Sequence, residues 1–145
     1  MSTTCADKYG VFSKHISDVA ALEGIQCLLG WDEMVMQPAG AAGAKARQKE
    51  VLAGLIHQRR TDPALGASLE ALGDADAGAD LTAVQRRNVE IATKDFKKAT
   101  AIPKEMSEKI AVLESEGYHA WLSARKESDY SKFAQTARRG NLQTP

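Results

Sequence analysis

The 145-residue sequence is poor in cysteine, histidine and aromatic residues, and it has no excess of charge of either sign. Two cysteines, Cys5 and Cys27, are too few for a disulfide scaffold and lack metal-ligand spacing, so we expect free thiols in a reducing compartment. No apolar run approaches the roughly 20 residues that cross a bilayer. Residues 1–8 lack the apolar core of a signal peptide. These absences predict a cytoplasmic protein that does not bind a membrane.

The balance of charge excludes one large class of partner. Nineteen basic side chains are matched by nineteen acidic ones, whereas binding to a phosphate backbone requires a basic excess that releases counterions. The pairs Arg86-Arg87 and Lys97-Lys98 could form a basic stripe, but Glu90 and Asp95 lie among them. We interpret this segment as a solvated helix surface, and we expect no nucleic-acid partner.

Hydrophobic periodicity predicts an all-α fold of long antiparallel helices. Apolar residues recur at three- and four-residue steps, and no convincing run alternates with a period of two. Pro38 should end the first helix, Gly30 should bend it near Trp31, and Asp62-Pro63 should begin the third. The expected helices cover residues 4–36, 41–60, 63–72, 81–100, 103–126 and 132–138, with a loop at 74–80.

The same spacing predicts which residues face the core, with Trp31 and Trp121 as core aromatics. The expected inward residues are Phe12, Ile16, Val19, Leu22, Ile25 and Leu29, then Ala44, Gln48, Val51, Leu55 and Ile56, then Leu65, Leu69 and Leu72, then Val84, Val89, Ala92 and Phe96, and finally Met106, Ile110, Leu113, Gly117, Ala120 and Ala124.

Candidate catalytic and metal-binding groups are few. The three histidines, His15, His57 and His119, include no pair at helical spacing and no H-E-x-x-H motif, so we expect no zinc site and place all three at the surface or an interface. Residues 74–80 resemble a calcium loop only briefly, because Gly78 and Gln85 stand where carboxylates are required.

Nucleophilic and acid–base chemistry is equally weakly indicated. The residues Ser115, Ser123 and Cys27 lack an activating context such as a G-x-S-x-G turn. The carboxylates Glu23, Asp32 and Glu33 could form an acid–base pair, but we interpret Asp32 as a residue that caps or hydrogen-bonds locally where the chain turns. No catalytic, cofactor-binding or metal residue is assigned.

A specific pattern begins at Leu28-Leu29-Gly30-Trp31-Asp32 and continues at Pro38-Ala39-Gly40-Ala41-Ala42. These residues resemble the start of the carboxypeptidase Taq family of zinc metallocarboxypeptidases. Further matches follow in the family's order and together cover about residues 8–134. They are Leu55-Ile56-His57, Thr61-Asp62-Pro63-Ala64-Leu65-Gly66, Ala99-Thr100-Ala101-Ile102-Pro103-Lys104-Glu105, Ser115-Glu116, Ala120-Trp121, Ala124-Arg125 and Asp129-Tyr130-x-x-Phe133-Ala134.

The resemblance implies a wholly helical, usually dimeric zinc enzyme that removes C-terminal residues from peptides. The family's zinc-binding H-E-x-x-H and its later Glu ligand lie downstream of this region, so no site residue is carried onto this chain. We therefore expect residues 1–134 to be the N-terminal helical cap region of a larger all-α metallopeptidase fold, inactive alone. Zinc and peptide substrates belong to the full-length enzyme, and a homodimer or self-association is expected.

The chain departs from the family pattern at several positions. Gln37 stands where the family usually has Met, and Lys45 stands where Arg is common. Residues 135–145 lack the family's usual continuation, so we expect a divergent, disordered tail that arose by truncation, alternative splicing or a misread exon boundary. The alternative function is a non-catalytic helical module that binds a partner or an intact homologue.

Overall fold

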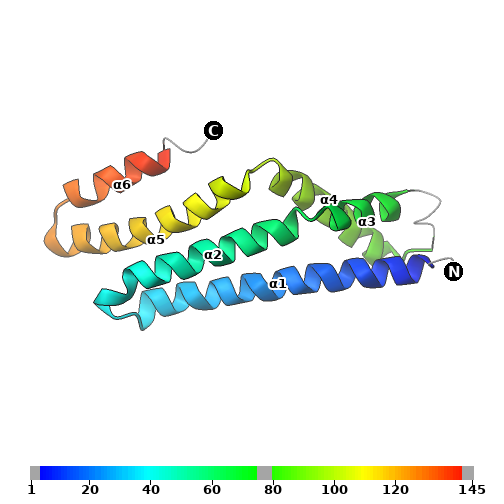
Figure 1. The fold of residues 1–145 in the computed structure, drawn as a ribbon, viewed down its shortest axis with the longest axis horizontal. Helices are drawn as coiled ribbons and strands as arrows, with labels where there is room; N and C mark the ends of the chain where they lie inside the picture. The colour runs from blue at the N-terminus through cyan, green and yellow to red at the C-terminus, as the bar shows by residue number, and fades with distance from the viewer. Residues whose placement is uncertain (1–3, 75–79, 142–145) are drawn as a thin grey trace. The chain divides into compact units, whose positions relative to one another are not determined.

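The computed structural model describes residues 4–74 and 80–141, and these residues are almost entirely helical (Figure 1). No strand occurs in these two ranges, which confirms the all-α prediction. The elements are α1 (Cys5–Val35), the 3₁₀ turn η1 (Ala39–Ala41), α2 (Ala42–Arg60), α3 (Pro63–Gly73), α4 (Ala83–Thr100), α5 (Lys104–Glu127) and α6 (Ser131–Asn141).

Local sequence signals set most helix ends. The Asp62 carboxylate accepts a hydrogen bond from the Ala64 amide at the start of α3, with Pro63 in the first turn. At the start of α4, Thr82 and Gln85 form a reciprocal capping box. Ser128 caps the C-terminal end of α5 in a left-handed backbone conformation (φ 54°). Among the described residues, it is the non-glycine residue that has a positive φ.

The chain divides into two compact units, each built from segments that are distant in sequence. The first comprises Met1–Glu23 and Ile56–Ile102, and the second comprises Gly24–Leu55 and Pro103–Pro145. In the first unit α3 packs against α4, and the leucine stripe of α3 joins the start of α1 in an apolar core. The buried members of that core are Phe12, Leu65, Leu69, Leu72, Leu81 and Val89.

In the second unit α5 packs against α6, and its buried residues come from α1, α2 and α5. Gly54 of α2 lies against the Glu108 side chain of α5, which occupies the space a Cβ atom would need. The buried residues that belong to this unit are Leu52, Ala53, Ala111 and Ala124 together with the polar Glu33, Lys49 and Ser115. This core therefore contains charged groups as well as apolar ones.

Several predicted core positions are wrong, and Trp31 and Trp121 are the largest. Their side chains are 52% and 41% exposed. Ile25, Val51 and Leu55 are also about half exposed, and Val84 is more exposed still. Ala44 and Gln48 are exposed as well. Lys49, Leu52 and Ala53 form the inner face of α2 instead, because Lys49 pairs with a buried carboxylate that sequence periodicity treats as a surface group.

Helix α1 continues through the interior Gly30 to Val35, because helical hydrogen bonding tolerates an interior glycine at a cost of about 1 kcal/mol. Residues 135–141, predicted to belong to a disordered tail, lie in α6, where Phe133 and Ala134 are partly buried in the unit that α5 and α6 share. Most of the predicted 74–80 loop, at residues 75–79, lies outside the described residues, as does 142–145.

Within the described ranges, none of the helices combines the length and the apolar character needed to cross a bilayer.

Candidate functional site

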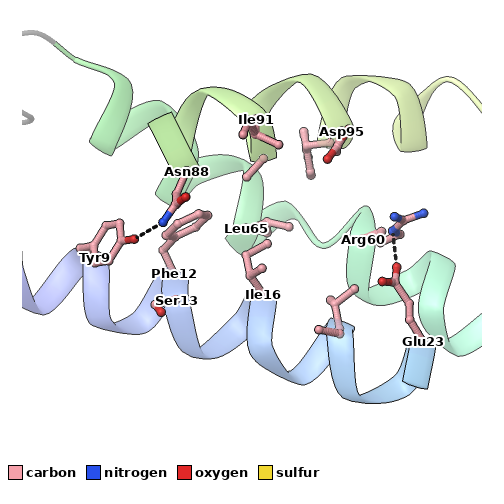
Figure 2. A pocket seen from close by; sticks show the side chains of 14 residues that line it. Tyr9, Phe12, Ser13, Ile16, Glu23, Arg60, Leu65, Asn88, Ile91 and Asp95 are labelled. Atoms are coloured by element: carbon pink, nitrogen blue, oxygen red, sulfur yellow. Dashed lines mark hydrogen bonds and ion pairs between the residues drawn. The ribbon is translucent and has the colours of Figure 1, made fainter. Parts of the chain in front are cut away.

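A groove of about 400 Å³ lies in the first unit, between α1 and α4, with α3 and the end of α2 contributing to its wall (Figure 2). Phe12 and Ile16 project into it from α1, Leu65 from α3, and Ile91 from α4. The volume falls within the range of small-molecule sites, which are about 300–1,000 Å³ and largely apolar.

Polar pairs lie at the two ends of this groove. At one end the Asn88 side-chain amide donates to the Tyr9 hydroxyl at 2.9 Å, and at the other Arg60 Nε lies 3.0 Å from Glu23 Oε1 (Figure 2). Asp95 adds a carboxylate to the α4 side. The lining supplies no histidine and no cysteine, and its apolar side chains suit an apolar group.

A buried polar cluster in the second unit is centred on Glu33 of α1. Its side chain is 4% exposed, and Lys49 Nζ of α2, 11% exposed, donates to Glu33 Oε2 at 2.8 Å. The Ser115 hydroxyl of α5, fully buried, donates to Glu33 Oε1. One carboxylate therefore joins three helices through charge-assisted hydrogen bonds.

His119 and Gln37 extend this cluster. His119 Nε2 lies 3.3 Å from Glu33 Oε1 and 3.1 Å from Gln37 Nε2. If His119 Nε2 accepted a hydrogen bond from the Gln37 amide, this nitrogen would carry no proton. Its lone pair would then face the Glu33 carboxylate, which is also an acceptor, and the two would repel each other. Reversing the Gln37 amide places its oxygen against His119 and lets Nε2–H donate to Glu33, which is the consistent assignment. In either orientation one end of the amide is buried and lacks a described hydrogen-bond partner.

Two opposing effects set the ionisation of Glu33. Burial raises the pKa of the carboxyl, but hydrogen bonds from Lys49 and Ser115, together with the positive charge of Lys49 and His119, outweigh it and hold the pKa below its usual value. Glu33 is therefore ionised at neutral pH. Ser115 has no solvent-exposed surface and donates to Glu33 rather than to His119, so the arrangement is not a nucleophile–histidine–acid triad.

The structure does not bring the three histidines together as ligands. His15 Nε2 lies 2.8 Å from the Arg59 carbonyl oxygen and His57 Nε2 bonds the Ile102 carbonyl, so each of these nitrogens is a donor rather than a free metal ligand. His119 faces Glu33 and Gln37. Over residues 4–74 and 80–141, no three His, Cys, Asp or Glu side chains gather closely enough to hold a metal ion.

The other predicted candidates also lie apart from any catalytic arrangement. Asp32, interpreted from sequence as a residue that caps or hydrogen-bonds locally where the chain turns, pairs its carboxylate with Lys45 across the η1 turn. Cys27 is exposed and Cys5 partly buried, and both are free. Sequence reasoning missed Glu33 as the centre of a cluster, because its partners stand 16 and 82 residues away. The available signal was a carboxylate on the apolar face of α1, four residues after Leu29.

A sequence profile of the carboxypeptidase Taq (M32) metallopeptidases matches residues 11–140. The chain belongs to this family, and its resemblance at the sequence level is confirmed. The match extends six residues beyond the predicted boundary at 134.

Individual relatives agree with this assignment. Thermostable carboxypeptidase 1 of Thermus thermophilus is 33% identical over 116 residues, which is 80% of this chain and 23% of that protein. The crystal structure of the M32 carboxypeptidase of Deinococcus radiodurans R1 is 36% identical, with a TM-score of 0.69 over 91% of this chain and 26% of that one. The BsuCP crystal structure, 21% identical, shares the fold with a TM-score of 0.83 over 89% and 26%. The chain thus spans about a quarter of the length of these relatives.

Proposed function

We propose that this chain supplies the N-terminal helical part of a zinc-dependent metallocarboxypeptidase, which removes C-terminal residues from peptides, and that alone it has no peptidase activity. The observation that carries the proposal is the family match over residues 11–140, in a chain whose three histidines do not form a metal site among the described residues. The zinc ligands and the catalytic groups belong, on this proposal, to the larger part of the family fold. No catalytic, cofactor-binding or metal residue is assigned to this chain.

The role of the chain in such an enzyme is structural. Helices α1 to α5 would support the peptide-binding part of the molecule, and the groove between α1 and α4 would receive an apolar group rather than carry out chemistry. We propose that the described helices α1 to α6 together form this N-terminal helical region. A cytoplasmic location is part of the same proposal, and the two free cysteines support it.

The direct test is hydrolysis by the purified 145-residue chain. Peptides with free carboxyl termini are incubated with the chain and added zinc, and released amino acids are measured with and without a chelator. We expect no release above that of a heat-unfolded control. Chelator-sensitive release of C-terminal residues would overturn the proposed inactivity, because it would require a metal site within this chain.

A second candidate function is favoured by one specific observation, the exposed apolar surface of α1 and α2. A non-catalytic helical module that binds a partner would need such a surface. The two functions predict different partners for this surface.

A further inference from the structure

The half of α1 that belongs to the second unit has a buried inner face and an exposed apolar face. Leu29 and Glu33 lie on its inner face, where Glu33 meets Lys49 and Ser115. On the other side, Leu28, Trp31 and Val35 recur at helical spacing and are 63%, 52% and 59% exposed. A contiguous exposed apolar patch on a protein surface marks an interaction site.

The exposed stripe consists of Cys27, Leu28, Trp31, Met34 and Val35, and it carries no charge of its own. Asp32 and Glu33 are the charged side chains between Gly24 and Val35, and both are already paired, with Lys45 and Lys49 respectively. A partner held by charge, such as a nucleic acid or an acidic peptide, finds no complementary group on this stripe. The occupant must present an apolar surface.

The size of the stripe limits which apolar occupant is stable. Its four large side chains together expose on the order of 400–500 Å², taking roughly 150–250 Å² for each large side chain. A stable interface buries about 800 Å² on each partner. A second copy that met this stripe alone would fall short, whereas a larger body that covers the stripe and continues past it would not.

We propose that the stripe on α1 docks the remaining part of an M32 carboxypeptidase, the portion of the family fold that has no counterpart in this chain. The inference rests on the proposed function and identifies the surface through which that function is assembled. Its support is the length of the relatives, three quarters of which lies outside the matched region, together with the uncharged apolar character of the stripe. Trp31 and Leu28 are the central contacts.

The test co-expresses the tagged 145-residue chain with the unmatched remainder of the Deinococcus radiodurans M32 carboxypeptidase and measures co-purification. We expect a stoichiometric complex, and we expect Trp31→Glu to reduce it at least about tenfold, because a charge would be buried in an apolar contact. The matched control is Val11→Glu, on the same helix and 65% exposed but outside the stripe, which should leave co-purification unchanged. Circular dichroism establishes that both variants keep their helices.

A second measurement reports burial of the stripe directly. In the Trp121→Phe variant, Trp31 is the sole tryptophan, and its fluorescence should shift to shorter wavelength when the remainder binds. Absence of a complex, an unshifted spectrum in the complex, or an undiminished complex with Trp31→Glu would each overturn the inference. A dimer of the 145-residue chain that Trp31→Glu dissociates in sedimentation would also overturn it, because a second copy would then be the occupant.

Hydrolysis measured on the same complex separates this inference from the proposed function. A complex that depends on Trp31 but releases no amino acids with zinc would contradict the proposed function and support docking. An active complex that tolerates Trp31→Glu would contradict docking and support the function.

Discussion

Replacing Glu33 with Gln should cause a large loss of stability, because it removes one partner of a buried ion pair. The side chain keeps its shape and can still accept from Ser115, but Lys49 Nζ loses its counter-ion while remaining 11% exposed. Removing one partner of a buried ion pair costs about 3–5 kcal/mol, because the other charge stays buried without compensation. We expect the free energy of unfolding to fall by this amount.

Urea unfolding followed by far-ultraviolet circular dichroism measures the effect, and a double-mutant cycle apportions it. Lys49→Met in the Glu33→Gln background removes the stranded ammonium, so the double variant should recover most of the loss. The matched control is Glu127→Gln, which removes an exposed, solvent-screened ion pair with Lys132 and should cost far less than Glu33→Gln.

The pH dependence supplies a second, independent readout. The folded pKa of Glu33 lies below its usual value of 4.5, so its contribution to stability is fully present above that value and is lost as the pH falls through the lower folded pKa. The difference in unfolding free energy between the wild type and Glu33→Gln should therefore be constant near neutral pH and shrink under acid conditions. A difference that grew on acidification would contradict the lowered pKa.

Two results would refute the reasoning about the cluster. An unchanged urea midpoint for Glu33→Gln would mean that Lys49 reaches solvent and that the pair is worth no more than a surface contact. A double variant no more stable than Glu33→Gln alone would mean that the stranded Lys49 charge is not the source of the loss.

Three other substitutions test separate features by the same unfolding assay. Gly66→Ala should destabilise the protein by about 1–3 kcal/mol, because the added Cβ would lie 2.8 Å from the Phe96 ring. Gly10→Ala, with open space around it, should stabilise the protein by about 0.5–1 kcal/mol. Equal effects would contradict the close packing of α3 on α4. Gln37→Met should be stabilising by up to about 1 kcal/mol because it removes a buried amide end without a described partner, and a clear loss would show that this end is hydrogen-bonded. Thr82→Ala should cost about 1 kcal/mol through loss of the α4 cap, and no change would mean that the capping box is not formed in solution.

Helix positions and the core of the first unit were predictable from the sequence because their signals are local. Asp62-Pro63 marked the start of α3, and Leu65, Leu69 and Leu72 are buried as their spacing predicted. These inferences depend on residues within one helix and its cap.

The interior of the second unit was not predictable because its determinants are long-range. Apolar periodicity assigned Val51 and Leu55 to the interior of α2, whereas Lys49 is buried there by its bond to Glu33, 16 residues earlier. Trp31 was assigned to the core on hydrophobicity alone. A buried charge is favourable only with its partner in place, and no local pattern reveals the partner.

The family was recognisable from ordered short matches, and the profile over residues 11–140 confirmed it. The predicted absence of site residues remains a prediction, and the hydrolysis assay tests it. The stripe on α1 could not be recognised from the sequence, because Trp31 and Leu28 are apolar and recur at helical spacing, as core residues do. Exposure distinguishes them, and exposure is a property of the folded chain.

The core of the first unit also constrains how the chain is made. Phe12 packs in one cluster with Leu65, so the first residues of α1 must wait for more than fifty further residues before their partners leave the ribosome. At about 5–20 residues per second, that interval lasts several seconds. Throughout it, α1 presents Phe12 as well as the Trp31 stripe to the surrounding solution, and a chaperone that recognises apolar helices would meet α1 before its partners do.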